Sequence, residues 1–153
     1  MADAQRSSKS AAGYAGDLQA SEAWELLQSE PQGRLIDVRT SAEWGFVGTP
    51  DLSGLGGEVL CVEWQRYPSM AVNPDFVAET KGALQRAGAD AATPLVFLCR
   101  SGARSRAAAL AMTKAGFSRA YNLAGGFEGD LDAERHRGTN NGWKASGLPW
   151  RQS

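Results

Sequence analysis

The sequence predicts an α/β fold in which a central parallel β-sheet carries helices on both faces. Short apolar segments at 34–38, 58–62, 94–98 and 119–123 alternate with segments of helical pattern. Such segments are typical of strands buried in a sheet, and strands that alternate with helices form parallel sheets covered on both sides. The length of 153 residues, with 42% apolar and 22% charged residues, fits one globular domain.

Local signals place the helices between these strands. Residues 21–28 carry apolar side chains on one helical face, and the serine at their start can cap a helix. Thr40 and Glu43 have the spacing of a capping box, which predicts a short helix after the strand at 34–38. The Asn-Pro pair at 73–74 predicts another helix start, and residues 106–114 form a strong helical segment.

Residues 1–17 are rich in Ala, Ser and Gly and lack the apolar core of a secretory signal. We therefore predict a flexible N-terminal segment at 1–17 and one folded domain at 18–153. Without an export signal the expected compartment is the cytoplasm, where the thiols of Cys61 and Cys99 stay reduced. No apolar stretch approaches the length of a membrane span, so no membrane partner is expected.

The composition also argues against several classes of site. The chain has a net charge of −1, two cysteines and one histidine. This balanced charge gives no global basic excess, so nucleic acid is not expected as a partner. Two cysteines do not build a disulfide framework or a zinc finger, and one histidine argues against a multi-histidine metal site. We therefore expect no bound metal.

Cys99 is the candidate nucleophile. It ends the apolar strand at 94–98 and opens a glycine-containing turn into a helix. The first N–H groups of a helix have no partner within the helix, and the helix dipole adds partial positive charge there. Together they form a cradle for an anion. The cradle favours the thiolate of Cys99, which is the nucleophilic form of the side chain.

The charges around Cys99 support this reading. No acidic residue occurs between Asp90 and Glu128, and the span holds five basic residues: Arg100, Arg104, Arg106, Lys114 and Arg119. Such a positive field attracts a small anionic substrate. Cys61 lies within the apolar segment at 58–62, so it is expected to be a buried, unreactive side chain.

Four motifs of the chain resemble those of the rhodanese domain and occur in the same order. They are LIDVR at 35–39 followed by Glu43 and Trp44, CRSGARS at 99–105, YNLAGGF at 121–127, and GLP at 147–149. The resemblance runs from about residue 18 to residue 150, which is nearly the whole expected domain. It implies a single rhodanese-like domain.

The resemblance also implies a function. Cys99 would take a sulfane sulfur from an anionic donor, either thiosulfate or a protein persulfide, and pass it to a thiophilic acceptor such as cyanide or a thiol. This is covalent catalysis, and it needs no cofactor and no metal. The implied substrate-binding residues are Arg100, Ser101, Gly102, Ala103, Arg104 and Ser105. The implied structural support comes from Asp37, Arg39 and Glu43.

Other functions remain open at this point. A sulfur-relay or protein-interaction module would use the same loop without turnover on small molecules. Phosphatases and arsenate reductases of this fold carry Arg six positions after the cysteine, whereas here Arg104 is five positions after and Ser105 is six. A redox sensor would use Cys61 as the resolving thiol for Cys99. The polar insertion at 129–142 is expected to be a surface loop, with partner docking as the alternative.

Overall fold

The computed structural model describes residues 13–152. Most of the expected flexible segment at 1–17 therefore lies outside the described residues. The part of this segment that is described belongs to the folded domain, because Tyr14 is buried and strand β1 begins at Gly16. The folded domain thus includes residues before the expected start at 18.

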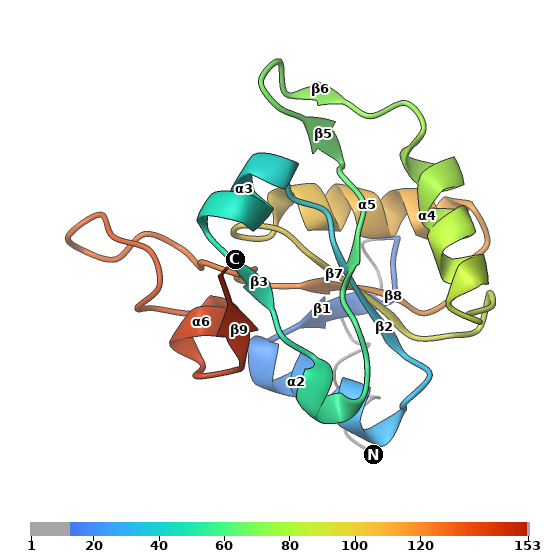
Figure 1. The fold of residues 1–153 in the computed structure, drawn as a ribbon, viewed down its shortest axis with the longest axis horizontal. Coiled ribbons are helices and arrows are strands. Elements are labelled where there is room, and N and C mark those ends of the chain that lie inside the picture. The colour runs from blue at the N-terminus through green and yellow to red at the C-terminus, as the bar shows by residue number, and fades with distance from the viewer. Residues whose placement is uncertain (1–12, 153) are drawn as a thin grey trace.

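The centre of the fold is a five-stranded sheet in which every neighbouring pair of strands is parallel (Figure 1). Its strand order is β1-β8-β7-β2-β4. The strands are β1 (Gly16–Leu18), β8 (Ala120–Leu123), β7 (Leu95–Leu98), β2 (Arg34–Asp37) and β4 (Leu60–Cys61). The predicted parallel α/β sheet is confirmed.

Helices cover both faces of this sheet, as predicted. One apolar cluster joins the sheet to α4 (Phe76–Arg86) and α5 (Ala103–Lys114). A second cluster joins the other face to α2 (Ala20–Ser29) and α6 (Gly142–Ala145). Helix α3 (Ser41–Phe46) contributes no buried residue and lies outside both layers.

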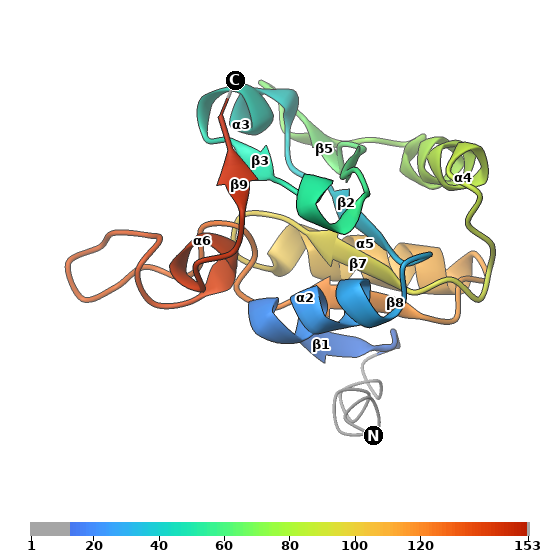
Figure 2. The ribbon, with the colours of Figure 1, turned by 60° about the horizontal axis from the view of Figure 1, so that its bottom comes forward.

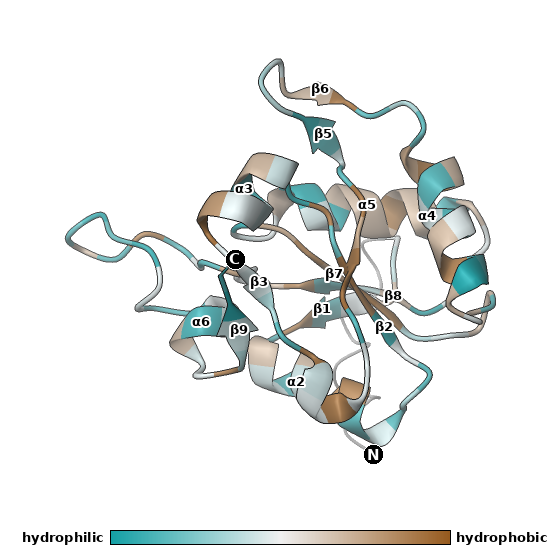
Figure 3. Cartoon of the chain, viewed as in Figure 1, coloured by the Kyte–Doolittle hydropathy of each residue, from teal (hydrophilic) through white to brown (hydrophobic). Residues whose placement is uncertain are grey.

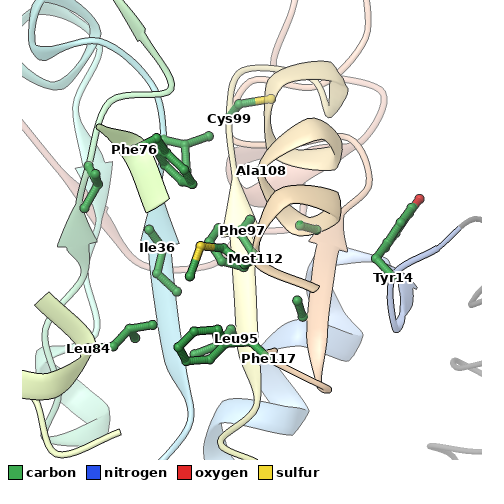
Figure 4. Packing of buried hydrophobic residues seen from close by; sticks show 14 residues of the cluster. Tyr14, Ile36, Phe76, Leu84, Leu95, Phe97, Cys99, Ala108, Met112 and Phe117 are labelled. Carbon is green, nitrogen blue, oxygen red and sulfur yellow. The ribbon is translucent and has the colours of Figure 1, made fainter. Parts of the chain in front are cut away.

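Strand β7 shows how the alternating pattern builds the two clusters. Leu95 and Phe97 face the cluster under α4 and α5, where Met112 packs against the sheet (Figure 4). Val96 and Leu98 face the opposite cluster. Side chains of a strand alternate between faces, so a strand buried on both faces must be apolar at every position. Figure 3 shows this apolar character concentrated in the central strands.

The predicted capping box is confirmed at the start of α3. The Thr40 hydroxyl accepts from the Glu43 N–H at 3.3 Å, and the Glu43 carboxylate accepts from the Thr40 N–H at 3.1 Å. The start of α4 differs from the prediction, because this helix begins at Phe76. The Asn73 side chain instead accepts from the Asp75 N–H at 3.0 Å, so that the Asn-Pro pair forms a turn before the helix.

The prediction that Cys61 is buried is wrong. Only Leu60–Cys61 of the expected strand at 58–62 forms β4, and β4 is the edge strand beside β2. Cys61 is therefore exposed. It lines a hollow, in which the surrounding protein desolvates the thiol and, together with the Asp37 carboxylate, raises the pKa of Cys61 to about 12. Cys61 consequently stays a neutral thiol.

Short elements complete the fold around the ends of the sheet. Strand β3 (Thr49–Pro50) pairs antiparallel with β9 (Trp150–Arg151), which brings the C-terminal segment beside the chain that follows α3 (Figure 2). A single turn of 3₁₀ helix spans Ser53–Leu55. Strands β5 (Gln65–Arg66) and β6 (Ala71–Val72) form a hairpin that projects from the body (Figure 1). Within residues 13–152, no helix is both long and apolar enough to cross a membrane.

Candidate functional site

The loop that carries Cys99 lies at the point where the strand order of the sheet reverses. Strands β2 and β7 are neighbours, and the chain continues outward from β2 to β4 on one side and from β7 to β8 on the other. The loops at the carboxyl ends of such a strand pair diverge and leave a crevice, which is where parallel α/β sheets bind ligands. Here these loops lead into α3 and into α5.

Cys99 lies in the cradle predicted for it. Its side chain points from the end of β7 toward the start of α5 (Figure 4). Its Sγ atom accepts from the Gly102 N–H at 3.1 Å and lies 3.2 Å from the Ser105 hydroxyl. Gly102 is the N-cap of α5 and has a φ of 120°, which a side chain would strain. Cys99 is only 1% exposed.

The segment that begins with the double glycine after β8, Gly125 and Gly126, packs closely against the backbone of the Cys99 loop. The Phe127 N–H donates to the Cys99 carbonyl at 2.7 Å, and the Glu128 N–H donates to the Arg100 carbonyl at 3.0 Å. A Cβ on Gly126 would lie 2.5 Å from the Cys99 carbonyl oxygen. Sequence reasoning did not assign Gly126 to the site, although a glycine pair directly after a strand is a signal for such close backbone approach.

A buried chain of polar groups continues from Cys99 to the edge strand β1. The Ser105 hydroxyl lies 2.6 Å from Asn122 Oδ1, and Asn122 Nδ2 donates to Asp17 at 3.0 Å. The Tyr14 hydroxyl donates to the same Asp17 oxygen at 2.7 Å.

The Asn122 amide orientation decides where the Ser105 proton goes. Since its nitrogen faces Asp17, its oxygen faces Ser105 and can only accept. The Ser105 hydroxyl has one proton and three acceptors within reach: Asn122 Oδ1 at 2.6 Å, Cys99 Sγ at 3.2 Å and the Gly102 carbonyl at 3.3 Å. These atoms compete for the proton, and Asn122 is the nearest. Asn122 is therefore a site residue that sequence reasoning missed, because only the folded sheet brings it beside α5.

Arg104 is held by Glu43 across the mouth of the loop. The guanidinium donates to the two carboxylate oxygens at 2.7 and 2.9 Å. Burial alone would raise the pKa of Glu43, but hydrogen bonds from Arg104 and Thr40 outweigh burial and lower it to about 2. Glu43 thus links α3 to α5, and it neutralises part of the positive charge that the sequence concentrates around Cys99.

Asp37 and Arg39 form a second pair, which is wholly buried. The Arg39 Nη2 atom lies 2.6 Å from Asp37 and donates to the Gly48 carbonyl at 2.7 Å. The guanidinium carbon of Arg39 also lies 4.4 Å from the ring centre of Phe127, a distance typical of cation–π contacts. This pair ties the end of β2 to the segment before β3 and to the chain after the double glycine.

Arg100, Ser101 and Ala103 line the outer side of the loop. Arg100 and Ala103 are exposed, and Ser101 is half-buried. Within the described part of the chain, neither the Arg100 guanidinium nor the Ser101 hydroxyl has a hydrogen-bond partner. Both groups are available to a ligand.

A groove of about 610 Å³ opens beside this loop. Its walls come from α3, the β5–β6 hairpin and the loop itself, and they include Glu43, Phe46, Tyr67, Met70, Arg100 and Arg104. Of the predicted substrate-binding residues, the structure brings Gly102 and Ser105 to the cysteine sulfur, places Arg100 at the groove, and pairs Arg104 with a carboxylate.

One group of potential metal ligands lies outside this site. Asp132, Glu134 and His136 have ligand atoms within 4.8 Å of one another in the loop before α6. The Asp132 carboxylate already accepts from the backbone N–H groups of Glu134 and His136 at 2.9 and 2.8 Å. These turn contacts account for the cluster. The expected surface loop at 129–142 is largely exposed, with α6 beginning at Gly142.

Comparisons with known proteins match nearly all of the described chain. The family model described as "STR4 middle domain" matches residues 15–153. The uncharacterised protein RC0915 of Rickettsia conorii is 35% identical over 128 residues, which cover 84% of this chain and 90% of that protein. The uncharacterised protein RP600 of Rickettsia prowazekii is 31% identical over a similar span.

Two solved structures share the fold. The crystal structure of Rv0390 from M. tuberculosis has a TM-score of 0.81 at 50% identity and covers 92% of this chain and 99% of its own. The solution structure of a polysulfide-sulfur transferase homodimer from Wolinella succinogenes has a TM-score of 0.56 at 24% identity, and it covers 99% of this chain and 90% of its own. At that identity the second likeness concerns the fold alone.

Proposed function

The chain belongs to the STR4 middle-domain family and has a rhodanese-like fold, and from that premise we propose that it is a sulfurtransferase whose Cys99 carries sulfur as a persulfide. The observation that carries the proposal is the position of Cys99 Sγ at the start of α5, between the Gly102 N–H at 3.1 Å and the Ser105 hydroxyl at 3.2 Å. The Gly102 N–H stabilises negative charge on sulfur, and the Ser105 hydroxyl does so when its proton points to Sγ rather than to Asn122.

The reaction has two halves. In the first, the Cys99 thiolate attacks the outer sulfur of thiosulfate, the S–S bond of the donor breaks, and sulfite leaves with the electron pair. In the second, an acceptor such as cyanide attacks the outer sulfur of the Cys99 persulfide. The S–S bond to Cys99 then breaks, its electron pair returns to Sγ as the thiolate, and thiocyanate leaves. This is ping-pong covalent catalysis.

The loop suits a sulfur that extends beyond the thiol. Cys99 itself is only 1% exposed, but an S–S bond reaches about 2 Å beyond Sγ. We infer that the N–H groups of Ser101 and Ala103 hold the outer sulfur while the Gly102 N–H holds Sγ, and that the exposed Arg100 draws in the anionic donor. Arg104 attracts the anionic donor less strongly than Arg100 does, because Glu43 neutralises its charge.

Other observations support sulfur transfer over the alternatives. The described neighbour from Wolinella succinogenes is named a polysulfide-sulfur transferase, and the rhodanese-like motifs occur in order along the chain. The reaction regenerates a free thiolate in each cycle, which the reducing cytoplasm expected from the sequence permits.

Intact-protein mass spectrometry tests the proposal. Wild type incubated with thiosulfate is expected to gain the mass of one sulfur atom, and cyanide is expected to remove it with release of thiocyanate. Cys99→Ser is expected to gain nothing, whereas the matched variant Cys61→Ser keeps the gain, because Cys61 lies outside the loop. If neither thiosulfate nor a protein persulfide adds sulfur to wild type, the proposal is wrong.

A further inference from the structure

The groove beside the Cys99 loop is far larger than an inorganic sulfur donor requires. Its volume of about 610 Å³ lies in the range of sites that hold organic ligands. Thiosulfate and cyanide are only a few atoms in size, so they leave most of the groove unoccupied. Beyond the loop, the lining includes Phe46 from α3 and Tyr67 and Met70 from the β5–β6 hairpin.

Exposed apolar side chains form the rim of this groove. Phe46 at the end of α3 is 84% exposed, and Tyr67 and Met70 in the hairpin turn are 65% and 38% exposed. Exposed apolar surface costs about 25 cal/mol per Å² relative to burial. Contiguous exposed patches rimmed by polar groups mark interaction sites, and buried aromatic anchors supply much of the binding energy at interfaces. A small anion bound at the loop would cover none of this rim.

The charged side chains that line the groove indicate which charge its occupant carries. Glu43 and Arg104 neutralise each other. Of the remaining charged residues in the wall, Arg100 and Arg137 are basic and Glu128 is acidic. Within residues 13–152, neither Arg100 nor Arg137 forms an ion pair with a carboxylate, and Arg137 donates only to the Gly129 carbonyl at 2.7 Å. Glu128 likewise has no ion-pair partner among these residues, so outside the Glu43–Arg104 pair the wall carries two positive charges and one negative charge. The net excess is positive, which favours an occupant with carboxylates.

We propose that the sulfur acceptor is a protein thiol on an extended acidic segment, which docks its apolar side chains against Phe46, Tyr67 and Met70 and its carboxylates against Arg100 and Arg137. This inference rests on the proposed function and names the substrate class of the second half-reaction. The acceptor thiolate attacks the outer sulfur of the protonated Cys99 persulfide. The S–S bond to Cys99 breaks, Sγ leaves as the thiolate, and the acceptor keeps the outer sulfur with its proton as a new persulfide.

Peptide acceptors test the inference. Persulfidated protein is mixed with a synthetic peptide that carries one cysteine between leucine and glutamate residues, with the same peptide in which lysines replace the glutamates, and with dithiothreitol. Rates of sulfur loss from Cys99 are followed by intact-protein mass spectrometry. We expect the acidic peptide to accept sulfur at least tenfold faster than the basic peptide at low salt, and the difference to shrink as salt rises.

Variants of the rim separate docking from chemistry. Phe46→Ser, Tyr67→Ser and Arg137→Gln are each expected to lower the rate ratio of acidic peptide to dithiothreitol by about fivefold to tenfold. The matched control Leu131→Ser removes another exposed apolar side chain, 44% exposed and outside the groove, and is expected to leave that ratio unchanged.

The outcomes distinguish this inference from the proposed function. If Cys99 gains no sulfur, the proposed function fails first. If Cys99 gains sulfur but transfers it to acidic and basic peptides equally, or if the rim variants leave the ratio unchanged, the docking inference alone is overturned. It is also overturned if wild type sediments as a dimer and Phe46→Ser as a monomer, because a second copy of the chain then covers the rim.

Discussion

Replacing Glu43 by Gln removes one negative charge while keeping the shape and hydrogen bonds of the capping box. Gln serves at this capping position as Glu does, so the contact with Thr40 is retained. What is lost is the charge opposite Arg104, whose guanidinium lies 2.7 and 2.9 Å from the two carboxylate oxygens. The variant therefore isolates the ion pair that joins α3 to α5.

The size of the effect follows from the pKa of Glu43, which falls from 4.5 to about 2 in the folded protein. A lowered pKa stabilises the folded state at every pH above the unfolded value, and the contribution disappears as pH falls through the folded value. Each pKa unit corresponds to about 1.4 kcal/mol, so the ionised carboxylate contributes about 3 kcal/mol at neutral pH through its contacts with Arg104 and Thr40 together. The contribution declines between about pH 5 and about pH 2.

Urea unfolding followed by tryptophan fluorescence measures this directly. Glu43→Gln keeps the Thr40 contact, so it is expected to lower the free energy of unfolding by about 2–3 kcal/mol at neutral pH and by much less near pH 3. The control is Glu79→Gln in the exposed Arg66–Glu79 pair, whose side chains are 48% and 46% exposed. It should cost less than about 1 kcal/mol. An equal loss for Glu43→Gln at both pH values would refute the argument, since the loss would then come from packing rather than charge.

Three further substitutions test the support of the cysteine loop. Gly126→Ala places a Cβ 2.5 Å from a loop carbonyl at a φ of 60° and is expected to lose about 2 kcal/mol or more of unfolding free energy; Gly45→Ala, with open space around it, should change it by less than about 1 kcal/mol. Asp37→Asn leaves the buried Arg39 without its anion, so thermal unfolding should report a loss of about 3–5 kcal/mol; a change below about 1 kcal/mol would contradict the burial of this pair. Asn122→Ala frees the Ser105 proton for the Cys99 sulfur, so iodoacetamide alkylation at neutral pH should speed up about threefold to tenfold. An unchanged or slower rate would show that Asn122 does not compete for that proton.

The parts of the site that the sequence predicts are those built from neighbouring residues. The capping box of Thr40 and Glu43 lies within one helical turn, and the loop from Cys99 to Ser105 follows directly from a strand that leads into a helix. Such patterns fix local backbone geometry, because the groups that satisfy each other are a few residues apart. Both were found where they were expected.

The parts that the sequence does not predict depend on contacts between distant segments. Arg104 and Glu43 are 61 residues apart, and Ser105 and Asn122 are 17 apart on different elements. Cys61 was misassigned for a related reason. A short apolar run does not distinguish a central strand from an edge strand, and only the sheet order shows that β4 has a neighbour on one side.

The pairing of β1 with β8 has a consequence for how the protein matures. These strands pair residues near 17 with residues near 122, so β1 can join the sheet only after most of the chain has been synthesised. Contacts of such long separation slow folding. Asp17 on β1 accepts a hydrogen bond from Asn122, and Asn122 accepts one from the Ser105 hydroxyl beside the thiol. The pairing of β1 with β8 therefore also completes the surroundings of Cys99. A chain still emerging from the ribosome therefore presents this thiol before Asp17 and Asn122 have positioned the Ser105 hydroxyl, and these surroundings form in the same step as the sheet.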